Sequence, residues 1–208
     1  MHLGLEESSK ILQGAANLFM RIGIKSVSMD DIARELGISK KTIYKHFKDK
    51  KELISNVIKF DIDQEKCLCE DCYNSTENAV QQMIDISRHI SHSHKDVNPT
   101  VIYDLQKYYP EEWAIMENFR NDFVRSAILK NIEKGRLEGL YRTDIEPDII
   151  ALIYITLISG MMLQLTKSDN DYNFVTLHRQ MVSYHLSGIC NQNGREYLEQ
   201  HINEITNE

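Results

Sequence analysis

Lysine side chains crowd one short stretch of the sequence, residues 39–53, SKKTIYKHFKDKKEL. The stretch holds six lysines and one histidine, although the whole chain carries a formal net charge of −7. Residues 1–60 hold eleven Lys and Arg against seven Asp and Glu, whereas the rest of the chain holds thirteen against twenty-four. A basic end on an acidic protein predicts that this end binds a polyanion.

Apolar residues interrupt these lysines at helical spacing. Ile43 and Phe47 are four residues apart, so both lie on one face of a helix. The opposite face carries Lys41, Thr42, Lys45 and His46, with Tyr44 at the boundary. We expect the apolar pair to anchor the helix and the cations to reach solvent.

Helix-capping signals define the elements that position this face. Ser28 begins a capping box completed by Asp31, Ser39 caps the lysine-rich helix, and Asp49 caps the helix after it. Gly37 permits the positive φ of a tight turn between the first two of these helices. Two short helices joined in this way form a helix-turn-helix, whose second helix enters the DNA major groove. A lysine-rich helix alone is more often only a solvated surface, but this position favours double-stranded DNA as the partner.

Residues 10–58 resemble the N-terminal domain of the TetR family of bacterial transcriptional regulators. The most specific part is SMDDIARELGISKKTIYKHFKDKKEL. The family pattern has Ile-Ala in the second helix, Gly at the turn, a Tyr-x-x-Phe recognition helix and Lys at the start of the fourth helix. These residues are Ile32, Ala33, Gly37, Tyr44, Phe47 and Lys50 in this chain.

The resemblance implies a role for individual residues. Ser28 and Lys50 match positions that hold phosphates, and Tyr44 matches an aromatic residue whose hydroxyl reaches a phosphate. The positions that face bases or backbone are Ser39, Lys40, Lys41, Thr42, Lys45 and His46. Lys41 stands where many relatives carry a small residue. We expect replacement of Lys50 to weaken binding to all DNAs, and replacement of Thr42 to alter which sequence is preferred.

The remainder of the chain is expected to be helical, since no segment shows strand alternation. The expected helices span 50–72, 76–93, 99–107, 110–134, 147–166 and 172–190. The predicted fold class is therefore all-α. A three-helix helix-turn-helix DNA-binding domain occupies residues 1–50, and a larger helical ligand-binding and dimerisation domain occupies residues 51–208.

Residues 149–163, IIALIYITLISGMML, form an uncharged run. A membrane-spanning helix needs about twenty apolar residues, so burial in protein is the favoured explanation. The resemblance places a homodimer interface in the last two long helices, here 147–166 and 172–190. Phe174, Leu177, Met181, Val182 and His185 add a second apolar stripe at helical spacing. An ordinary core within one chain is the alternative.

The resemblance also implies a small-molecule effector bound in the helical body, and a DNA operator from which the effector releases a repressor. Aromatic and thioether residues in the matching region are Met83, Tyr103, Tyr108, Tyr109, Trp113, Met116 and Phe119. Such residues also fill ordinary cores. No cofactor is predicted.

Three cysteines stand close together in CLCEDC, residues 67–72. They suggest an alternative, a metal- or thiol-responsive regulator that uses Cys67, Cys69 and Cys72. On a helix Cys69 and Cys72 share a face and Cys67 lies nearly opposite, and neighbouring carboxylates raise thiol pKa values. No metal site is therefore predicted.

Enzyme motifs do not appear in the sequence, which has no phosphate-binding glycine loop, no GxSxG and no HExxH. We therefore expect no catalytic residues. The first residues, MHLGLEESSK, lack a secretory pattern, so we expect a cytoplasmic protein. A helical interaction protein that does not bind DNA is a further alternative.

Overall fold

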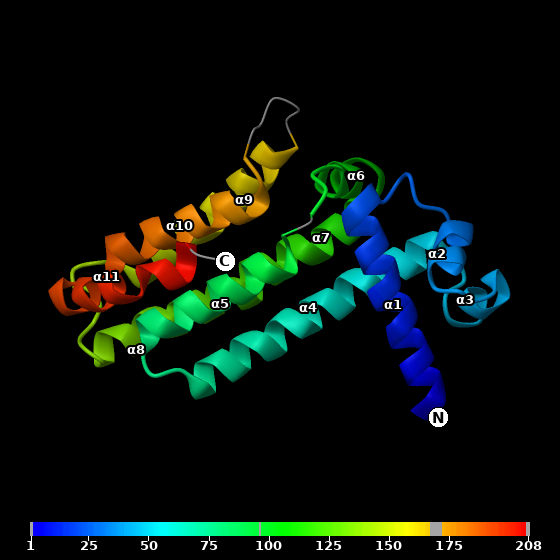
Figure 1. The fold of residues 1–208 in the computed structure, drawn as a ribbon. Coiled ribbons are helices and arrows are strands. Elements are labelled where there is room, and N and C mark those ends of the chain that lie inside the picture. The colour runs from blue at the N-terminus through cyan, green and yellow to red at the C-terminus, as the bar shows by residue number, and fades with distance from the viewer. Residues whose placement is uncertain (1, 96, 167–171, 207–208) are drawn as a thin grey trace. The chain divides into compact units, whose positions relative to one another are not determined.

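The computed structural model describes residues 2–95, 97–166 and 172–206. These residues are mainly helical, as predicted, and the β-structure among them is an isolated bridge between Tyr141 and Cys190. The helices are α1 (His2–Ile22), α2 (Met29–Glu35), α3 (Lys40–His46), α4 (Lys50–Ser75), α5 (Ala79–Ser93), α6 (Thr100–Tyr108), α7 (Pro110–Phe119), α8 (Arg125–Leu137), α9 (Pro147–Leu165), α10 (Phe174–Ile189) and α11 (Gln192–Thr206) (Figure 1). A π-helical segment, η1 (Arg120–Val124), joins α7 to α8.

The structure differs from the sequence-based expectation in three places. The helix expected at 110–134 is interrupted by η1 and continues as α8 to Leu137. α1 begins at His2, whereas the apolar stripe that predicted it begins near residue 10. α11 was not predicted, because its apolar residues are sparse. Its start is nevertheless capped locally, since Asn191 Oδ1 accepts a hydrogen bond from the Gly194 amide at 3.1 Å.

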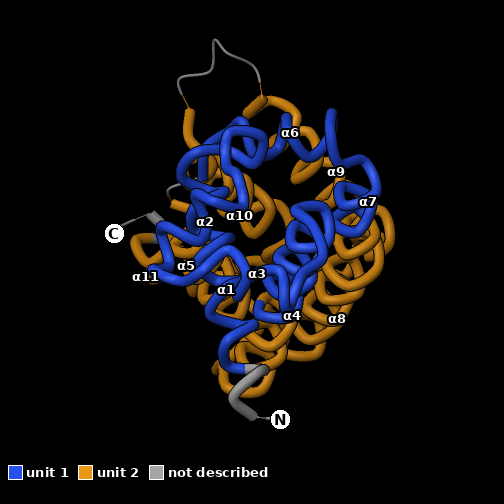
Figure 2. Tube along the Cα trace, turned by 90° about the vertical axis from the view of Figure 1, so that its right-hand side faces the viewer, with its two compact units in different colours: residues 1–64, 96–117 blue, residues 65–95, 118–208 orange. Residues whose placement is uncertain are grey.

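The chain divides into two compact units (Figure 2). Unit 1 comprises residues 1–64 and 96–117, and unit 2 comprises residues 65–95 and 118–208. α4 and α7 contribute residues to both units. The compact units therefore do not follow the functional boundary predicted at residue 50, which remains a prediction.

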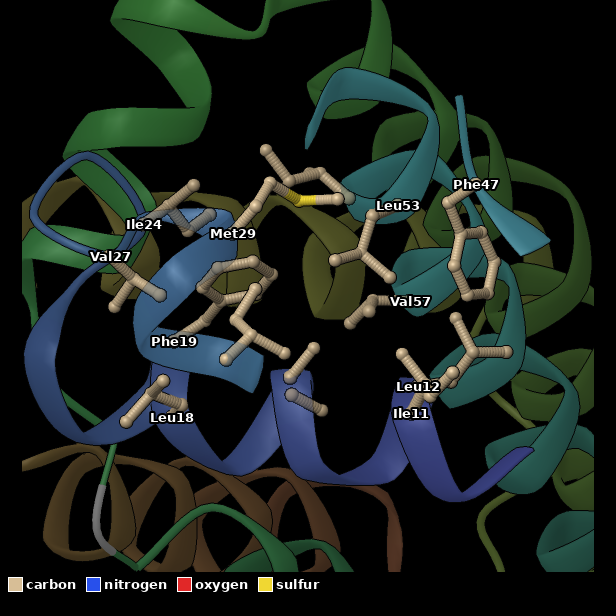
Figure 3. Close-up of a cluster of buried hydrophobic side chains, with 14 of the residues drawn as sticks. Ile11, Leu12, Leu18, Phe19, Ile24, Val27, Met29, Phe47, Leu53 and Val57 are labelled. Carbon is tan, nitrogen blue, oxygen red and sulfur yellow. The ribbon is translucent and has the colours of Figure 1, made fainter. Parts of the chain in front are cut away.

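Unit 1 is built around one apolar cluster shared by α1, α2, α3, α4 and α6. Figure 3 shows labelled side chains from α1, α2 and α4 converging on its centre, with Phe19, Met29 and Leu53 among them. Ile43 from α3 is fully buried in the same cluster, and Phe47 is 4% exposed. These two residues anchor α3 as predicted, and they leave its other side toward solvent.

A buried carboxylate attaches α6 to the loop between α1 and α2. Asp104 is 5% exposed and accepts a hydrogen bond from the Lys25 backbone amide at 2.7 Å. Gly23 makes the approach possible, because its φ is +93° and a Cβ there would lie 2.5 Å from Thr100 Oγ1. α6 is thus part of the support of the helix-turn-helix.

Unit 2 has its own apolar core, formed by α5, α8, α9, α10 and α11. One end of this core contains a buried polar network around Asn131. Its amide donates to Ala79 O at 2.9 Å and to Gln82 Oε1 at 2.7 Å, and its oxygen accepts from Tyr141 at 3.0 Å. The Tyr141 ring packs on Gly135, where a Cβ would lie 2.1 Å from it. The network holds α5, α8 and the following turn together.

α9 is long and apolar enough to cross a membrane by length and composition, yet only 22% of its most apolar window is buried. Ala151, Tyr154 and Ile155 face the core of unit 2. Large apolar side chains on its other face are exposed: Ile149 (56%), Leu152 (59%), Ile153 (45%), Leu157 (36%) and Leu163 (54%). The α10 stripe behaves differently from the expectation. Its members are buried or half-buried inside unit 2, so it adds little to this exposed surface.

Candidate nucleic-acid interface

The turn between α2 and α3 is set by local hydrogen bonds. Ser28 Oγ accepts from the Asp31 amide at 3.2 Å, and the Ser28 amide donates to Asp31 Oδ2 at 3.0 Å, which completes the predicted capping box. Gly37 has a φ of +64°, as the predicted turn requires. Ser39 Oγ then accepts from the Thr42 amide at 3.1 Å and caps α3. The sequence-predicted geometry of both caps is confirmed.

α3 presents a polar, mainly cationic face to solvent. Lys41 and Lys45 are exposed, and Tyr44 is 45% exposed. Thr42 and His46 are half-buried at the edges of this face. An α-helix fits the major groove of B-DNA, and lysines on such a helix reach both phosphates and guanine edges. The arrangement therefore suits duplex DNA.

Two of the predicted DNA-binding side chains are paired with carboxylates. Lys40 Nζ lies 2.8 Å from Asp30 Oδ2, and both groups are about half exposed. His46 Nε2 lies 2.8 Å from Glu7 Oε2 on α1. The Lys40 pair lies at the surface, where such contacts contribute little to stability. The His46 side chain is only 18% exposed and lies beside Glu7.

The two predicted phosphate-holding residues already have partners inside unit 1. Lys50 Nζ donates to Ile24 O at 2.6 Å, and burial lowers the pKa of its ammonium. The Ser28 hydroxyl donates to Asp31 Oδ2 at 2.6 Å, and these hydrogen bonds lower the pKa of the Asp31 carboxyl. Lys50 thus supports the α1–α2 loop in addition to any contact with DNA.

Glu7 was not among the sequence-predicted site residues. The helix expected from the apolar stripe started near Lys10, so no signal placed Glu7 beside α3. A helix traced back by heptad spacing would have shown only that Glu7 lies on the stripe of Ile11 and Leu18. The pairing with His46 depends on how α1 packs against α3, which is a tertiary property.

The predicted effector residues are divided between the two units. Met83 is buried in the core of unit 2, and Phe119 stacks on Phe123 there at a centroid distance of 5.4 Å. Trp113, Met116 and Tyr109 pack against the core of unit 1. Tyr103 and Tyr108 are surface residues of unit 1, 43% and 40% exposed.

The two exposed tyrosines are engaged by lysines. Lys107 Nζ donates to the Tyr103 hydroxyl at 2.6 Å, and Lys25 Nζ donates to the Tyr108 hydroxyl at 3.0 Å. The hydrogen bond from Lys25 lowers the pKa of Tyr108. Both lysines also lie over tyrosine rings in cation–π geometry. Tyr103 and Tyr108 therefore form a surface cluster and do not line the interior of unit 1.

The cysteines of α4 have properties that disfavour the thiol-responsive alternative. Cys67 is exposed, Cys69 is half-buried and Cys72 is buried. Burial, with a smaller contribution from Glu65, raises the pKa of the Cys69 thiol to about 12, and burial also raises the pKa of Cys72. Thiols of this kind are poor nucleophiles at neutral pH. Within the described part of the chain, no group of three or more Cys, His, Asp and Glu side chains is placed to hold a metal ion.

Comparison with known proteins connects this geometry to a family. Residues 11–57, which span α1 to α3 and the start of α4, match the family model described as bacterial regulatory proteins, tetR family. An HTH-type transcriptional regulator of Staphylococcus aureus strain MRSA252 is 36% identical over 93 residues. That match covers 43% of this chain and half of the length of the relative.

Solved structures share the fold along almost the whole chain. A transcriptional regulator from Saccharomonospora viridis, crystallised in complex with choline, superposes with a TM-score of 0.70 at 20% identity and covers 90% of this chain and 99% of its own. A TetR-family regulator from Mesorhizobium loti gives a TM-score of 0.65 at 19% identity and covers 90% and 98%. Residues 11–57, with their capped turn, are therefore a helix-turn-helix domain of the tetR family of bacterial regulatory proteins, and the described chain shares the fold of the solved TetR-family structure.

Proposed function

We propose that this protein is a cytoplasmic transcriptional repressor that binds a palindromic DNA operator as a homodimer and is released by a small-molecule effector. The family supports a role in transcription regulation, and the remaining parts of the proposal rest on the features below.

The exposed face of α3 is the observation that supports DNA binding. Lys41, Thr42 and Lys45 project from a short helix that Ile43 and Phe47 fix to the core of unit 1. A lysine-rich face held rigidly on the second helix of a helix-turn-helix has the geometry for a major groove. In this account the lysines bind phosphates, and Thr42 with His46 reads base edges.

The exposed apolar face of α9 supports the homodimer. Leu152, Leu163 and Ile149 are each more than half exposed on one side of the helix. Soluble monomers rarely leave such a contiguous apolar surface in water, so it requires a partner surface. A second copy of the same face, related by a twofold axis, buries both at once. α10 borders this face, and its Tyr184 is 74% exposed.

Twofold symmetry in the protein predicts twofold symmetry in the operator. Two α3 helices would enter successive major grooves on one side of the duplex, about 34–36 Å apart. Two linked helix-turn-helix domains also bind DNA with higher affinity than a single one, by avidity. An effector that changes the spacing of the two helix-turn-helix domains would therefore release the DNA.

A mobility-shift assay with the DNA flanking the protein's own gene tests this function. The wild-type protein is expected to retard one fragment in the presence of excess nonspecific DNA. Lys50→Ala should weaken binding to specific and nonspecific DNA alike and reduce the slope of log affinity against log salt by about one. Thr42→Val should instead change which sequence is preferred.

Equal retardation of all fragments, with no competition difference, would contradict sequence-specific binding. If Lys50→Ala and Thr42→Val shift sequence preference equally, the division between phosphate and base contacts is wrong. Lys48→Ala, at an exposed position just before α4, serves as the control for loss of one lysine.

A further inference from the structure

The seam between α5 and α10 in unit 2 is polar at one end. The two helices pack antiparallel, because Ser91 near the end of α5 meets His178 near the start of α10, with Ser91 Oγ 3.4 Å from His178 Nδ1. At the opposite end, the Ala79 carbonyl is linked through Asn131 to Tyr141, which bridges to Cys190. Polar residues thus continue into the interior of the unit along this seam.

Two more polar groups lie along the same stripes. Ser87 precedes Ser91 by four residues and His185 follows His178 by seven, so each shares the inward face of its helix. In this antiparallel register both residues lie between the Ser91–His178 contact and the opposite end of the seam. Ser87 is 1% exposed and His185 is 6% exposed.

One atom of each residue lacks a hydrogen-bond partner among the described residues. Ser87 Oγ and His185 Nε2 are both fully buried atoms that accept and donate no hydrogen bond among the described residues. Burying a polar atom without a partner is unfavourable, and most buried polar atoms in folded proteins are paired. Two such atoms on facing helices leave hydrogen-bonding capacity that the described residues do not use.

The surroundings define what kind of molecule fits. Burial lowers the pKa of His185 to about 4, so its imidazole is neutral at neutral pH. Burial, followed by the charges of His94 and Arg179, does the same for His178, whose pKa is also about 4. Glu65 lies 3.7 Å from His94; burial raises the pKa of its carboxyl, and the charges of His94 and Arg120 oppose that rise. Burial is thus the largest influence on the pKa values of His178, His185 and Glu65 alike.

Apolar and aromatic side chains complete the walls. The Tyr154 ring meets the His185 imidazole edge to face at a centroid distance of 4.8 Å. Met83, Met181 and Ile155 belong to the same buried cluster. Thioether side chains adapt to irregular shapes, so methionines can pack against a bound small molecule.

We propose that the α5–α10 seam of unit 2 binds a neutral organic molecule through a hydroxyl or carbonyl oxygen, which hydrogen-bonds to Ser87 Oγ and His185 Nε2 while its apolar part packs on Tyr154 and the methionines. This inference rests on the proposed function, since it gives the chemical class of the effector. A free carboxylate or ammonium is excluded from the class, because an added charge would be buried without a partner.

Four molecules of one shape test the proposal: p-cresol, p-toluate, 4-methylbenzylamine and toluene. Binding to the full-length protein is measured by ligand-observed NMR, without DNA. p-Cresol is expected to bind most tightly, and toluene about five- to tenfold more weakly for lack of the hydrogen bond. p-Toluate and 4-methylbenzylamine should bind more weakly still. Tighter binding of either charged molecule would overturn the proposed class.

Variants locate the binding. Ser87→Ala and His185→Phe should each weaken p-cresol about five- to tenfold and leave toluene nearly unchanged. The matched controls are Ser187→Ala and His89→Phe, which change an exposed serine of α10 and an exposed histidine of α5. Equal p-cresol affinity in all four variants, or no p-cresol binding at all, would mean that water or nothing occupies the site. Circular dichroism of each variant verifies that it is folded.

A separate DNA-binding assay keeps this proposal distinct from the proposed function. If the fragments bind as expected but the protein binds no DNA, the seam is a binding site and the regulator proposal fails. If the protein binds its DNA and no fragment binds, the regulator proposal stands and the seam inference fails.

Discussion

α3 and α9 both expose a row of side chains that makes little contact with the rest of the chain. The chemical character of these exposed side chains differs between the two helices. The outward residues of α3 are cations and hydroxyls, and its inward residues Ile43 and Phe47 are nearly fully buried. α9 shows the opposite pattern, since its exposed face carries Leu152, Leu163 and other large apolar side chains. A cationic face is stable in water and can bind an anionic partner reversibly. An exposed apolar face is unfavourable in water and is stabilised by a lasting contact with another apolar surface. The comparison predicts a reversible contact at α3 and a permanent contact at α9.

The largest effect is expected from a charge placed on the α9 face. Leu152→Glu should convert the proposed homodimer to a monomer, because a carboxylate buried in an apolar interface costs several kcal/mol. Sedimentation velocity measures the change, and DNA affinity should fall more than about a hundredfold with it. Leu137→Glu is the control, since Leu137 is 84% exposed and lies on α8. A dimer that survives Leu152→Glu unchanged would place the interface elsewhere.

The next effect concerns the buried network of unit 2. Asn131→Ala should lower the free energy of unfolding by about 2–4 kcal/mol, because Gln82, Tyr141 and the Ala79 carbonyl would lose a buried partner. Denaturant unfolding measures it. Asn118→Ala removes an exposed asparagine from α7 and should change stability by less than about 0.5 kcal/mol. A similar small value for Asn131→Ala would show that the network contributes little.

Acid should destabilise unit 2 through its buried histidines. The pKa values of His178 and His185 are lowered to about 4 in the folded protein, against the usual value of about 6.5. The unfolded chain therefore takes up protons that the folded chain does not, so the free energy of unfolding falls as the pH drops from about 6.5 to about 4. His178→Phe with His185→Phe should flatten this part of the stability profile. His89→Phe, at an exposed site, should leave the slope as it is in wild type.

The smallest effect is expected at the pair between α1 and α3. Glu7→Gln removes a carboxylate 2.8 Å from His46 and so reduces the negative charge beside the DNA-facing surface. Affinity for nonspecific DNA should rise about two- to threefold, and the ratio of operator to nonspecific affinity should fall as His46 loses its fixed position. Fluorescence anisotropy on both DNAs measures these constants. Glu6→Gln, at the neighbouring exposed position, should match wild type. An identical response of the two variants would show that Glu7 has no specific effect on DNA binding.

Local signals explain what the sequence predicted well. The capping residues Ser28 and Ser39 and the turn residue Gly37 each act within a few positions, so their geometry follows from spacing. The apolar run of α9 was also visible, because its length and lack of charge need no partner to be recognised.

The features that escaped prediction depend on packing between distant segments. Glu7 meets His46 only because α1 extends back to His2. No local signal showed that Lys25, in the loop between α1 and α2, donates a hydrogen bond to the hydroxyl of Tyr108, a predicted effector residue. The unpaired atoms of the α5–α10 seam appear only when the register of the two helices is known, since serine and histidine recur in many helices without consequence.

Whether α3 is the DNA-reading helix of a dimer can be measured by selecting sequences from a pool of random duplex DNA with the purified protein. We expect an enriched sequence with twofold symmetry, whose half-sites lie about one helical turn apart or a multiple of it. We also expect Thr42→Val to alter the half-site without altering the spacing. Recovery of no enriched sequence, or of an asymmetric one bound by a monomer, would contradict the assignment of α3 as the DNA-reading helix of a dimer.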